Sequence, residues 1–149
     1  AQTLQRHADG LIWLHTGDIA TMDEDGFFYF KLRAKRMIKS SGINVYPQQV
    51  EGVLYQHPAV RLACVIGVPD EAQVQKVKAF IALKEGYKAG PETEKALIDH
   101  CTKSLIKWCC PREIEFRDNL PTTLVGKIAF NVLEKEEIAK LKAAGKYAG

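Results

Sequence analysis

The stretch that decides the fold reads VRLACVIGVPDEAQVQKVKAFIAL, from Val60 to Leu83. Apolar residues alternate along its first half at Val60, Leu62, Cys64, Ile66 and Val68. They alternate again at Val77, Ala79, Ile81 and Leu83, with Phe80 on the other face. A period of two is typical of β-strands. The stretch therefore predicts two strands, joined through Pro69-Asp70 and a polar segment.

Helices are predicted on either side of this strand pair. The segment from Pro47 to His57 has Pro at its first position and an apolar stripe at the i, i+3, i+4, i+7 spacing, and Pro58 ends it. Gly52 lies inside this helix and costs about 1 kcal/mol against Ala, so we expect a close-packing reason for it. Two further helices are predicted, at 91–107 and from 130 to about 144, the last ending before Gly145.

Short strands complete the prediction. The first thirty residues indicate a hairpin between the apolar segment 11–14 and the aromatic segment 27–30, with a turn at 23–26. A second hairpin joins 37–38 to 43–45 around the Ser40-Ser41-Gly42 turn, and 113–116 is a short strand. The predicted fold class is α+β, a small sandwich of a short β-sheet flanked by helices and preceded by a β-hairpin.

The composition limits the classes of protein to which the chain can belong. The chain has 149 residues, 46% of them hydrophobic, which suits one domain. No apolar run is long enough to cross a membrane, and no signal segment opens the chain. The four cysteines form no C-x-x-C pair, which argues against a zinc site or a disulfide framework, and Cys64 and Cys101 stand at apolar positions. We expect no metal site and a reducing, cytoplasmic location.

Several familiar chemistries are excluded by their spacing. Gly126-Lys127 lacks the earlier Gly and the following Ser or Thr of a phosphate-binding loop. Asp23, Asp25 and Gly26 lack the first and twelfth ligands of a calcium loop. There is no G-x-S-x-G nucleophile elbow and no H-E-x-x-H.

Four short signals remain, each with an ordinary structural explanation. Thr16-Gly17-Asp18 follows a strand and could bind a ribose diol, although a turn Asp is the commoner outcome. Residues 33–39 read RAKRMIK, which is typical of a solvated basic edge. Ser41-Gly42 suits a hairpin turn. The segment 120–128 places Lys127 in a Gly- and Thr-bearing loop, which suits either a surface Lys or an ammonium that pairs with phosphate and carboxylate oxygens.

Taken together, these signals resemble the C-terminal part of the adenylate-forming superfamily, which includes acyl-CoA synthetases, peptide-synthetase adenylation domains and luciferases. Eight strings match in the family's order, from about Gly10 to Glu137. They are HTGD (15–18), DGFFYF (25–30), R-x-K-x-x-IK (33–39), GINVYP-x-x-VE (42–51), HP-x-V (57–60), GVPD (67–70), PR-x-IEF (111–116) and LP-x-T-x-x-GKI (120–128). The forms at 46–47 and 126–128 are most similar to medium- and long-chain fatty acyl-CoA synthetases.

The resemblance implies a role for each candidate site residue. Asp18 would bind the ribose hydroxyls of ATP, with Arg33 assisting. Lys35 would be the hinge between a large N-terminal domain and a small C-terminal one. Lys127 would bridge the acyl carboxylate and the α-phosphate in the adenylation step. Ser41 and Gly42 would line the pantetheine tunnel in the later thioester step.

The resemblance also implies a domain organisation. Residues 1–34 would end the large adenylation domain, and residues 35–149 would form the lid domain. The family's phosphate loop, adenine site and acyl pocket lie upstream of Ala1, so we expect this chain to be the C-terminal fragment of a longer enzyme and inactive alone. We expect residues 1–34 to be less stably ordered than the rest, or paired with a neighbouring chain through self-association.

The function implied is ATP-dependent acyl-CoA ligation, in which a carboxylic acid and ATP give an acyl-AMP that reacts with CoA. ATP and CoA would be the cofactors, with Mg bound to ATP rather than by these residues. One alternative is an adenylation domain that loads a carrier protein. Another, of a different class, is a basic nucleic-acid-binding module using Lys31 to Lys39, which lacks the expected RNP-like aromatic string. We expect no nucleic acid partner.

Overall fold

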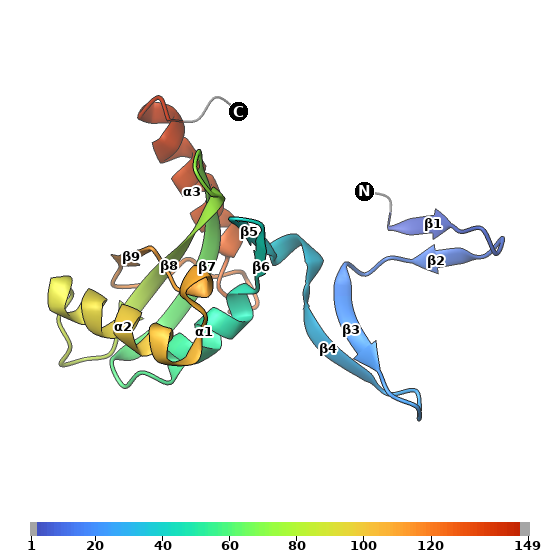
Figure 1. The fold of residues 1–149 in the computed structure, drawn as a ribbon, viewed down its shortest axis with the longest axis horizontal. Helices are drawn as coiled ribbons and strands as arrows, with labels where there is room; N and C mark the ends of the chain where they lie inside the picture. The colour runs from blue at the N-terminus through green and yellow to red at the C-terminus, as the bar shows by residue number, and fades with distance from the viewer. Residues whose placement is uncertain (1–2, 147–149) are drawn as a thin grey trace. The chain divides into compact units, whose positions relative to one another are not determined.

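A computed structural model describes residues 3–146 of the chain (Figure 1). The chain divides into two compact units, Ala1–Met37 (unit 1) and Ile38–Gly149 (unit 2). The boundary between them lies three residues after the one expected from the sequence. No helix among the described residues is both long and apolar enough to span a membrane.

Unit 1 consists of two separate antiparallel hairpins. Strand β1 (Leu4–Arg6) pairs with β2 (Ile12–Leu14), and β3 (Asp18–Met22) pairs with β4 (Phe28–Arg33). The predicted single hairpin between 11–14 and 27–30 is therefore wrong, since each segment pairs with a nearer neighbour. Short loops cost less entropy to close than a long one.

Aspartates hold both hairpin turns of unit 1. Asp9 accepts a hydrogen bond from the Leu11 amide at 2.9 Å and one from the Trp13 indole at 2.9 Å. Asp23 accepts one from the Phe27 amide at 2.8 Å, and one from the Tyr29 hydroxyl at 2.7 Å. Such side chain to backbone bonds are local, so they fix each turn independently of the rest of the chain.

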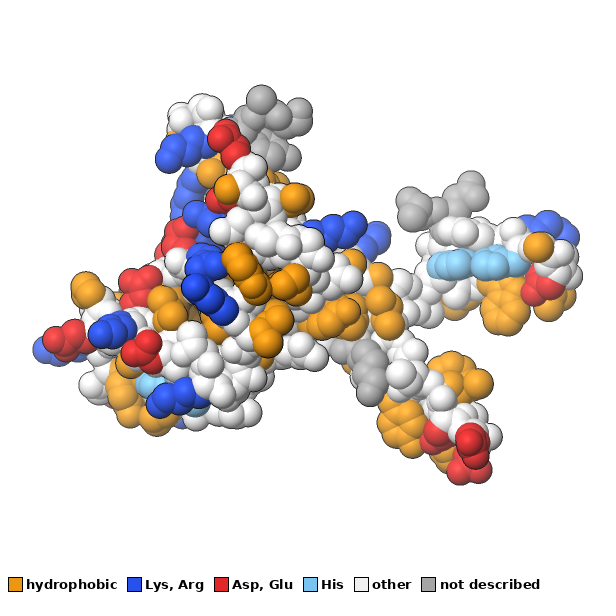
Figure 2. All heavy atoms as spheres, viewed as in Figure 1, with side chains coloured by type: hydrophobic (Ala, Val, Ile, Leu, Met, Phe, Trp, Pro, Cys, Tyr) orange, Lys and Arg blue, Asp and Glu red, His pale blue; other side chains and the backbone are white. Residues whose placement is uncertain are grey.

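Unit 1 has no core of its own. Among residues 3–37, Lys31 apart, none is buried. Its large apolar side chains are exposed, including Trp13 at 51%, Phe28 at 75% and Phe30 at 55%. Figure 2 shows hydrophobic side chains at the surface of both hairpins.

Unit 2 is built on the predicted strand pair. Strands β7 (Val60–Asp70) and β8 (Val74–Leu83) pair antiparallel along almost their whole length. Two elements lie along the other edge of β8: strand β5 (Ile38–Ser40), which continues into β6 (Ile43–Val45), and the parallel strand β9 (Glu113–Phe116). The β5–β6 hairpin and all three later strands agree with the sequence prediction.

Three helices flank this sheet, as expected. They are α1 (Pro47–Tyr55), α2 (Pro91–Ser104) and α3 (Phe130–Ala143). Helix α2 is shorter than predicted because Leu105 is extended and 107–109 forms a separate 3-10 turn. The expected packing reason for Gly52 is wrong: Gly52 is exposed, and a Cβ built there meets no atom within 4 Å.

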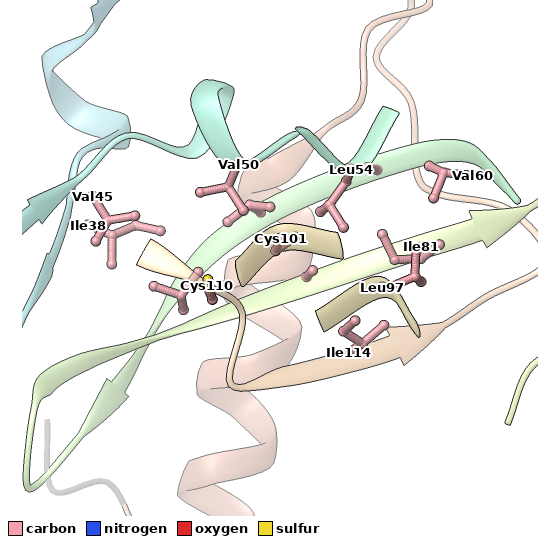
Figure 3. Close-up of a cluster of buried hydrophobic side chains, with 14 residues drawn as sticks. Ile38, Val45, Val50, Leu54, Val60, Ile81, Leu97, Cys101, Cys110 and Ile114 are labelled. Atoms are coloured by element: carbon pink, nitrogen blue, oxygen red, sulfur yellow. The ribbon is translucent and has the colours of Figure 1, made fainter. Parts of the chain in front are cut away.

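The sheet is buried on both faces by two separate cores. Residues Ala63, Val65, Val77, Ala79 and Ile81 face α1 and α2, where they pack with side chains such as Leu54 and Leu97 (Figure 3). Residues Cys64, Ile66, Val68 and Phe80 face α3, where they pack with Leu133. Alternation along β7 and β8 therefore supplies both cores. Cys64 and Cys101 are buried and form no disulfide, as predicted.

An ion cluster also joins α3 to the sheet. The Lys78 ammonium, 3% exposed, lies 2.6 Å from Glu113, 2.8 Å from Glu115 and 2.8 Å from Glu137. Burial alone would lower the pKa of Lys78, but the hydrogen bonds that its ammonium donates to the three carboxylates outweigh burial and raise the pKa. Burial would raise the pKa of Glu115, but its bonds from Lys78, Lys140 and Arg117 lower it to about 2. Lys78 and Glu115 are therefore charged near neutral pH.

Candidate functional site

The two predicted ribose-binding residues come together in unit 1. Asp18 and Arg33 are opposite each other across β3 and β4, and Arg33 Nε lies 2.8 Å from Asp18 Oδ1. Arg33 also donates to the carbonyl of Thr16 at 2.9 Å, which fixes the guanidinium at the end of the hairpin. The ion pair uses one carboxylate oxygen, so Oδ2 of Asp18 can accept hydrogen bonds from a diol.

Gly17 shapes the approach to this pair. Its φ of +77° is in the left-handed region, and its carbonyl accepts the Ala34 amide at 2.8 Å. The chain therefore turns immediately before Asp18 and is tied back to the end of β4. Lys35, the predicted hinge, is exposed in the 3-10 turn Ala34–Arg36, shortly before the division between the two units.

Ser41 and Gly42 form the two-residue turn between β5 and β6. Both are left-handed, with φ of +49° and +79°, which is the conformation of the hairpin turns that match strand twist. Both residues are exposed. A Cβ built on Gly42 meets no atom within 4 Å, so the space beside this turn is open.

Lys127 is presented by a small closed loop. Its base is buried through Leu120 and Ala129, which are 5% and 6% exposed, and Ala129 N donates to Pro121 O at 2.8 Å. Within the loop, Thr123 N donates to the Lys127 carbonyl at 2.7 Å, and the Lys127 amide donates to Thr123 Oγ1 at 3.2 Å. The backbone of Lys127 is thus held while its side chain is exposed. Within residues 3–146, no ion pair involves Lys127.

The Lys127 loop and the Ser41–Gly42 turn are supported by different cores. Leu120 and Ile128 pack in the core that faces α3. Ile38 and Val45, which flank the turn, pack in the core that faces α1 and α2. One compact unit therefore carries both predicted groups, each supported from its own side of the sheet.

The carboxylate trio Glu113, Glu115 and Glu137 is the one group among the described residues whose oxygens lie close enough to share a metal ion. The Lys78 ammonium bonds to all three. A cation already occupies the centre of the group, and Lys76, Arg117 and Lys140 add positive charge at its edge, so the arrangement suits an internal ion cluster rather than a metal site.

Sequence reasoning missed the side chains that support these groups. Lys78 stands in a strand, where the charge pattern indicates nothing about its partners 35 to 59 residues away. Gln75 accepts the Lys39 amide at 2.9 Å, although nothing in the polar segment before β8 singles it out. The alternation that places Val77 and Phe80 on opposite faces would also have placed Lys78 on the α3 side.

Comparison with known proteins identifies the family of this chain. Residues 49–127, more than half of the chain, match the AMP-binding enzyme C-terminal domain. The chain belongs to this family. The matched region of the AMP-binding enzyme C-terminal domain contains β7, β8, β9 and α2, and it ends at Lys127.

Relatives of this AMP-binding enzyme C-terminal domain are ligases by name. The chain is 45% identical over 125 residues to a long-chain-fatty-acid–CoA ligase of Bacillus subtilis, covering 84% of the chain and 22% of the relative. It is 43% identical over 130 residues to an enzyme of the same name from Escherichia coli O6:H1, covering 87% of the chain and 22% of the relative.

Solved structures of proteins with related names also resemble this chain. The chain resembles the crystal structure of Brucella canis acyl-CoA synthetase with a TM-score of 0.70 and 42% identity, over 84% of this chain and 23% of that one. It also resembles the anthranilate CoA ligase AuaEII bound to anthranoyl-AMP, with a TM-score of 0.75 and 42% identity over 89% and 25%. The chain thus spans less than a quarter of the length of the curated relatives named above.

Proposed function

We propose that this chain is the C-terminal part of an ATP-dependent acyl-CoA ligase, which converts a carboxylic acid and ATP to an acyl-AMP and then transfers the acyl group to CoA. The observation that carries the proposal is the Lys127 loop. It ends the family match, its base is buried, and it presents a cation without an internal partner among the described residues.

Attack of a carboxylate on ATP brings two anions together. An ammonium held between them stabilises the charge that develops in the transition state. Lys127 suits this role because the loop fixes its backbone while the side chain can reach outward. Asp18 and Arg33 would bind the ribose of the same nucleotide, with Asp18 Oδ2 accepting from its hydroxyls.

Thioester formation needs a thiol at the same carbonyl carbon. The exposed Ser41–Gly42 turn suits a narrow approach path, since it carries no Cβ at its second residue. Because the turn and the Lys127 loop are fixed to different sides of one rigid unit, a rotation at Lys35 would exchange them at a common active site.

The acid is proposed only as a carboxylic acid. Relatives named for long-chain fatty acids, 4-hydroxybutyrate and acetate are 42 to 45% identical to this chain. Acids of very different length thus accompany similar C-terminal domains. The acyl group would be selected by the N-terminal part of the enzyme, with Mg²⁺ bound to ATP there rather than by these residues.

The half-reactions test these roles in the full-length enzyme. Lys127→Ala should lower acid-dependent pyrophosphate exchange at least a hundredfold, which corresponds to about 3 kcal/mol, and leave CoA consumption from synthetic acyl-AMP nearly intact. Gly42→Leu should do the reverse, because a branched side chain would fill the thiol path and strain a left-handed turn. Equal loss of both half-reactions in both variants, with normal circular dichroism, would contradict the two-conformation proposal.

The isolated 149-residue chain should not catalyse pyrophosphate exchange, since the adenine and acyl sites of the family lie outside it. Exchange above a no-protein control would refute this. The exposed aromatic residues of unit 1 would pack against the N-terminal domain, or against a second copy when the chain is alone. Light scattering measures such self-association.

A cytoplasmic location is proposed because none of the four cysteines forms a disulfide. The nucleic-acid alternative has no support from the family or from the named relatives. A carrier-protein thiol in place of CoA is the remaining alternative, and a direct comparison of the two acceptors with the full-length enzyme distinguishes them.

A further inference from the structure

The β5–β6 hairpin, which carries the Ser41–Gly42 turn, has little regular pairing with the rest of the sheet. Its register with β8 consists of the single pair Ser40–Val74. In an antiparallel strand, alternate amides point away from the paired neighbour. Here the amides of Lys39 and Ser41 are the ones donated toward β8.

These two amides are accepted by two glutamines, Gln73 just before β8 and Gln75 within it. The Ser41 amide donates to the main-chain carbonyl of Gln73 at 3.0 Å, as in an ordinary ladder. The Lys39 amide donates to the side-chain oxygen of Gln75 at 2.9 Å. The Gln75 side chain thus holds β5 at Lys39, next to the single backbone pair with β8.

Val74, between the two glutamines, has an unusual backbone conformation. Its φ of +67° is left-handed, which is rare for a β-branched residue. The single β5–β8 pair, Ser40–Val74, lies at this residue. Strain of this kind persists only where surrounding contacts determine the backbone.

Gly67 makes room for the Gln75 side chain. A Cβ built on Gly67 would lie 3.0 Å from Cδ and Nε2 of Gln75 and 3.0 Å from Cγ2 of Ile38. Any larger residue would push the glutamine or β5 out of position. The Gln75 amide is therefore seated between β7 and the strand that leads into the turn.

We propose that Gln75 is a positioning residue for the thioester-forming step: its side chain fixes β5 and so sets the place of the Ser41–Gly42 turn. This inference rests on the proposed function, because the turn matters to catalysis only if the thiol approaches past it. Gln75 acts through the turn and touches no reacting atom. Lys127 is attached through the other core, so adenylation should not depend on Gln75.

The test uses two substitutions of similar size in the full-length enzyme. Gln75→Met removes the acceptor, whereas Gln75→Glu keeps an oxygen at the same place. Gln75→Met should lower the rate of CoA consumption from synthetic acyl-AMP about tenfold to a hundredfold, with pyrophosphate exchange unchanged. Gln75→Glu should keep the rate of the thioester step near that of the wild type. Gln56→Met, an exposed glutamine just after α1, is the matched control.

Hydrogen exchange of the 149-residue chain tests the geometry separately. The Lys39 amide should be protected in the wild type and in Gln75→Glu, and should lose its protection in Gln75→Met. Equal loss of both half-reactions, no loss of the thioester step, or an unprotected Lys39 amide in the wild type would overturn the inference. A wild-type enzyme that forms acyl-AMP but no acyl-CoA would instead refute the proposed function, and the positioning role with it.

Discussion

Replacing Lys78 by Met should be among the most destabilising single changes in unit 2. Lys78 is 3% exposed and is bonded to three carboxylates, at 2.6 to 2.8 Å. Four cations (Lys76, Lys78, Arg117, Lys140) and four carboxylates (Glu113, Glu115, Glu136, Glu137) make up the connected cluster, so its formal charge is zero. Met fills similar volume but leaves one unbalanced negative charge.

The expected loss follows from burial. Removing one partner of a buried ion pair costs about 3 to 5 kcal/mol, because the remaining charge is left without compensation. With an m-value of about 2 kcal/mol/M, the urea midpoint of unit 2 should fall by about 2 M. Fluorescence of Trp108, the tryptophan of unit 2, and far-ultraviolet circular dichroism both follow the transition.

Lys140→Met is the matched control. Lys140 contacts Glu115 at 3.0 Å and Glu137 at 2.7 Å in the same cluster, but its side chain is 54% exposed. Solvent screens such a charge, so its loss should cost less than about 1 kcal/mol. Equal costs for Lys78→Met and Lys140→Met would refute the reasoning from burial.

A double variant distinguishes the loss of the attraction made by Lys78 from the cost of leaving the Glu137 carboxylate buried without it. Lys78→Met combined with Glu137→Leu should be more stable than Lys78→Met alone, since the carboxylate left buried in α3 is also removed.

The dependence of stability on acid pH provides a further check. The pKa of Glu115 is about 2 when folded, below the usual 4.5, so its contribution to stability is complete above pH 4.5 and is lost as the pH falls toward 2. This acid dependence should weaken in Lys78→Met.

Two other measurements test separate parts of the molecule. Burial, and then the neighbouring His100, lower the pKa of His57 below its usual 6.5, so the folded chain binds fewer protons than the unfolded one. The free energy of unfolding should therefore fall as the pH drops below about 6.5. In urea titrations between pH 7.5 and 5.5, His57→Gln should show a smaller fall than the wild type. Amides of unit 1, such as those of Ala20 and Tyr29, should exchange much faster than that of Ile66, because no apolar side chain among residues 3–37 is buried. Equal protection in a monomer would contradict this.

The local sequence determined most of the secondary structure. Alternation from Val60 to Leu83 predicted β7 and β8, and Pro47 and Pro91 marked the first residues of two helices. These signals are reliable because periodicity and proline act within a few residues of themselves. Adjacent residues of β8 such as Ala79 and Phe80 were predicted to face opposite sides, and they lie in the two different cores.

The local sequence did not predict which strands of unit 1 pair with each other. The aromatic segment 27–30 and the apolar segment 11–14 both indicate strands, but the pattern does not say which strand each one joins. Asp9 and Asp23 decided this through turn hydrogen bonds that close two short hairpins instead of one long one. The ion pair of Asp18 with Arg33 follows from the register of the second hairpin.

By itself, the sequence determined the order of elements in unit 2, the family resemblance and the identity of the candidate residues Asp18, Gly42 and Lys127, because motifs and periodicity are local properties of the chain. Only the tertiary structure decided what supports them. Lys78 meets Glu137 across 59 residues, and Gln75 meets Lys39 across 36. Contacts at such separations depend on how strands and helices pack, and a charge or an amide in a strand gives no local sign of its distant partner.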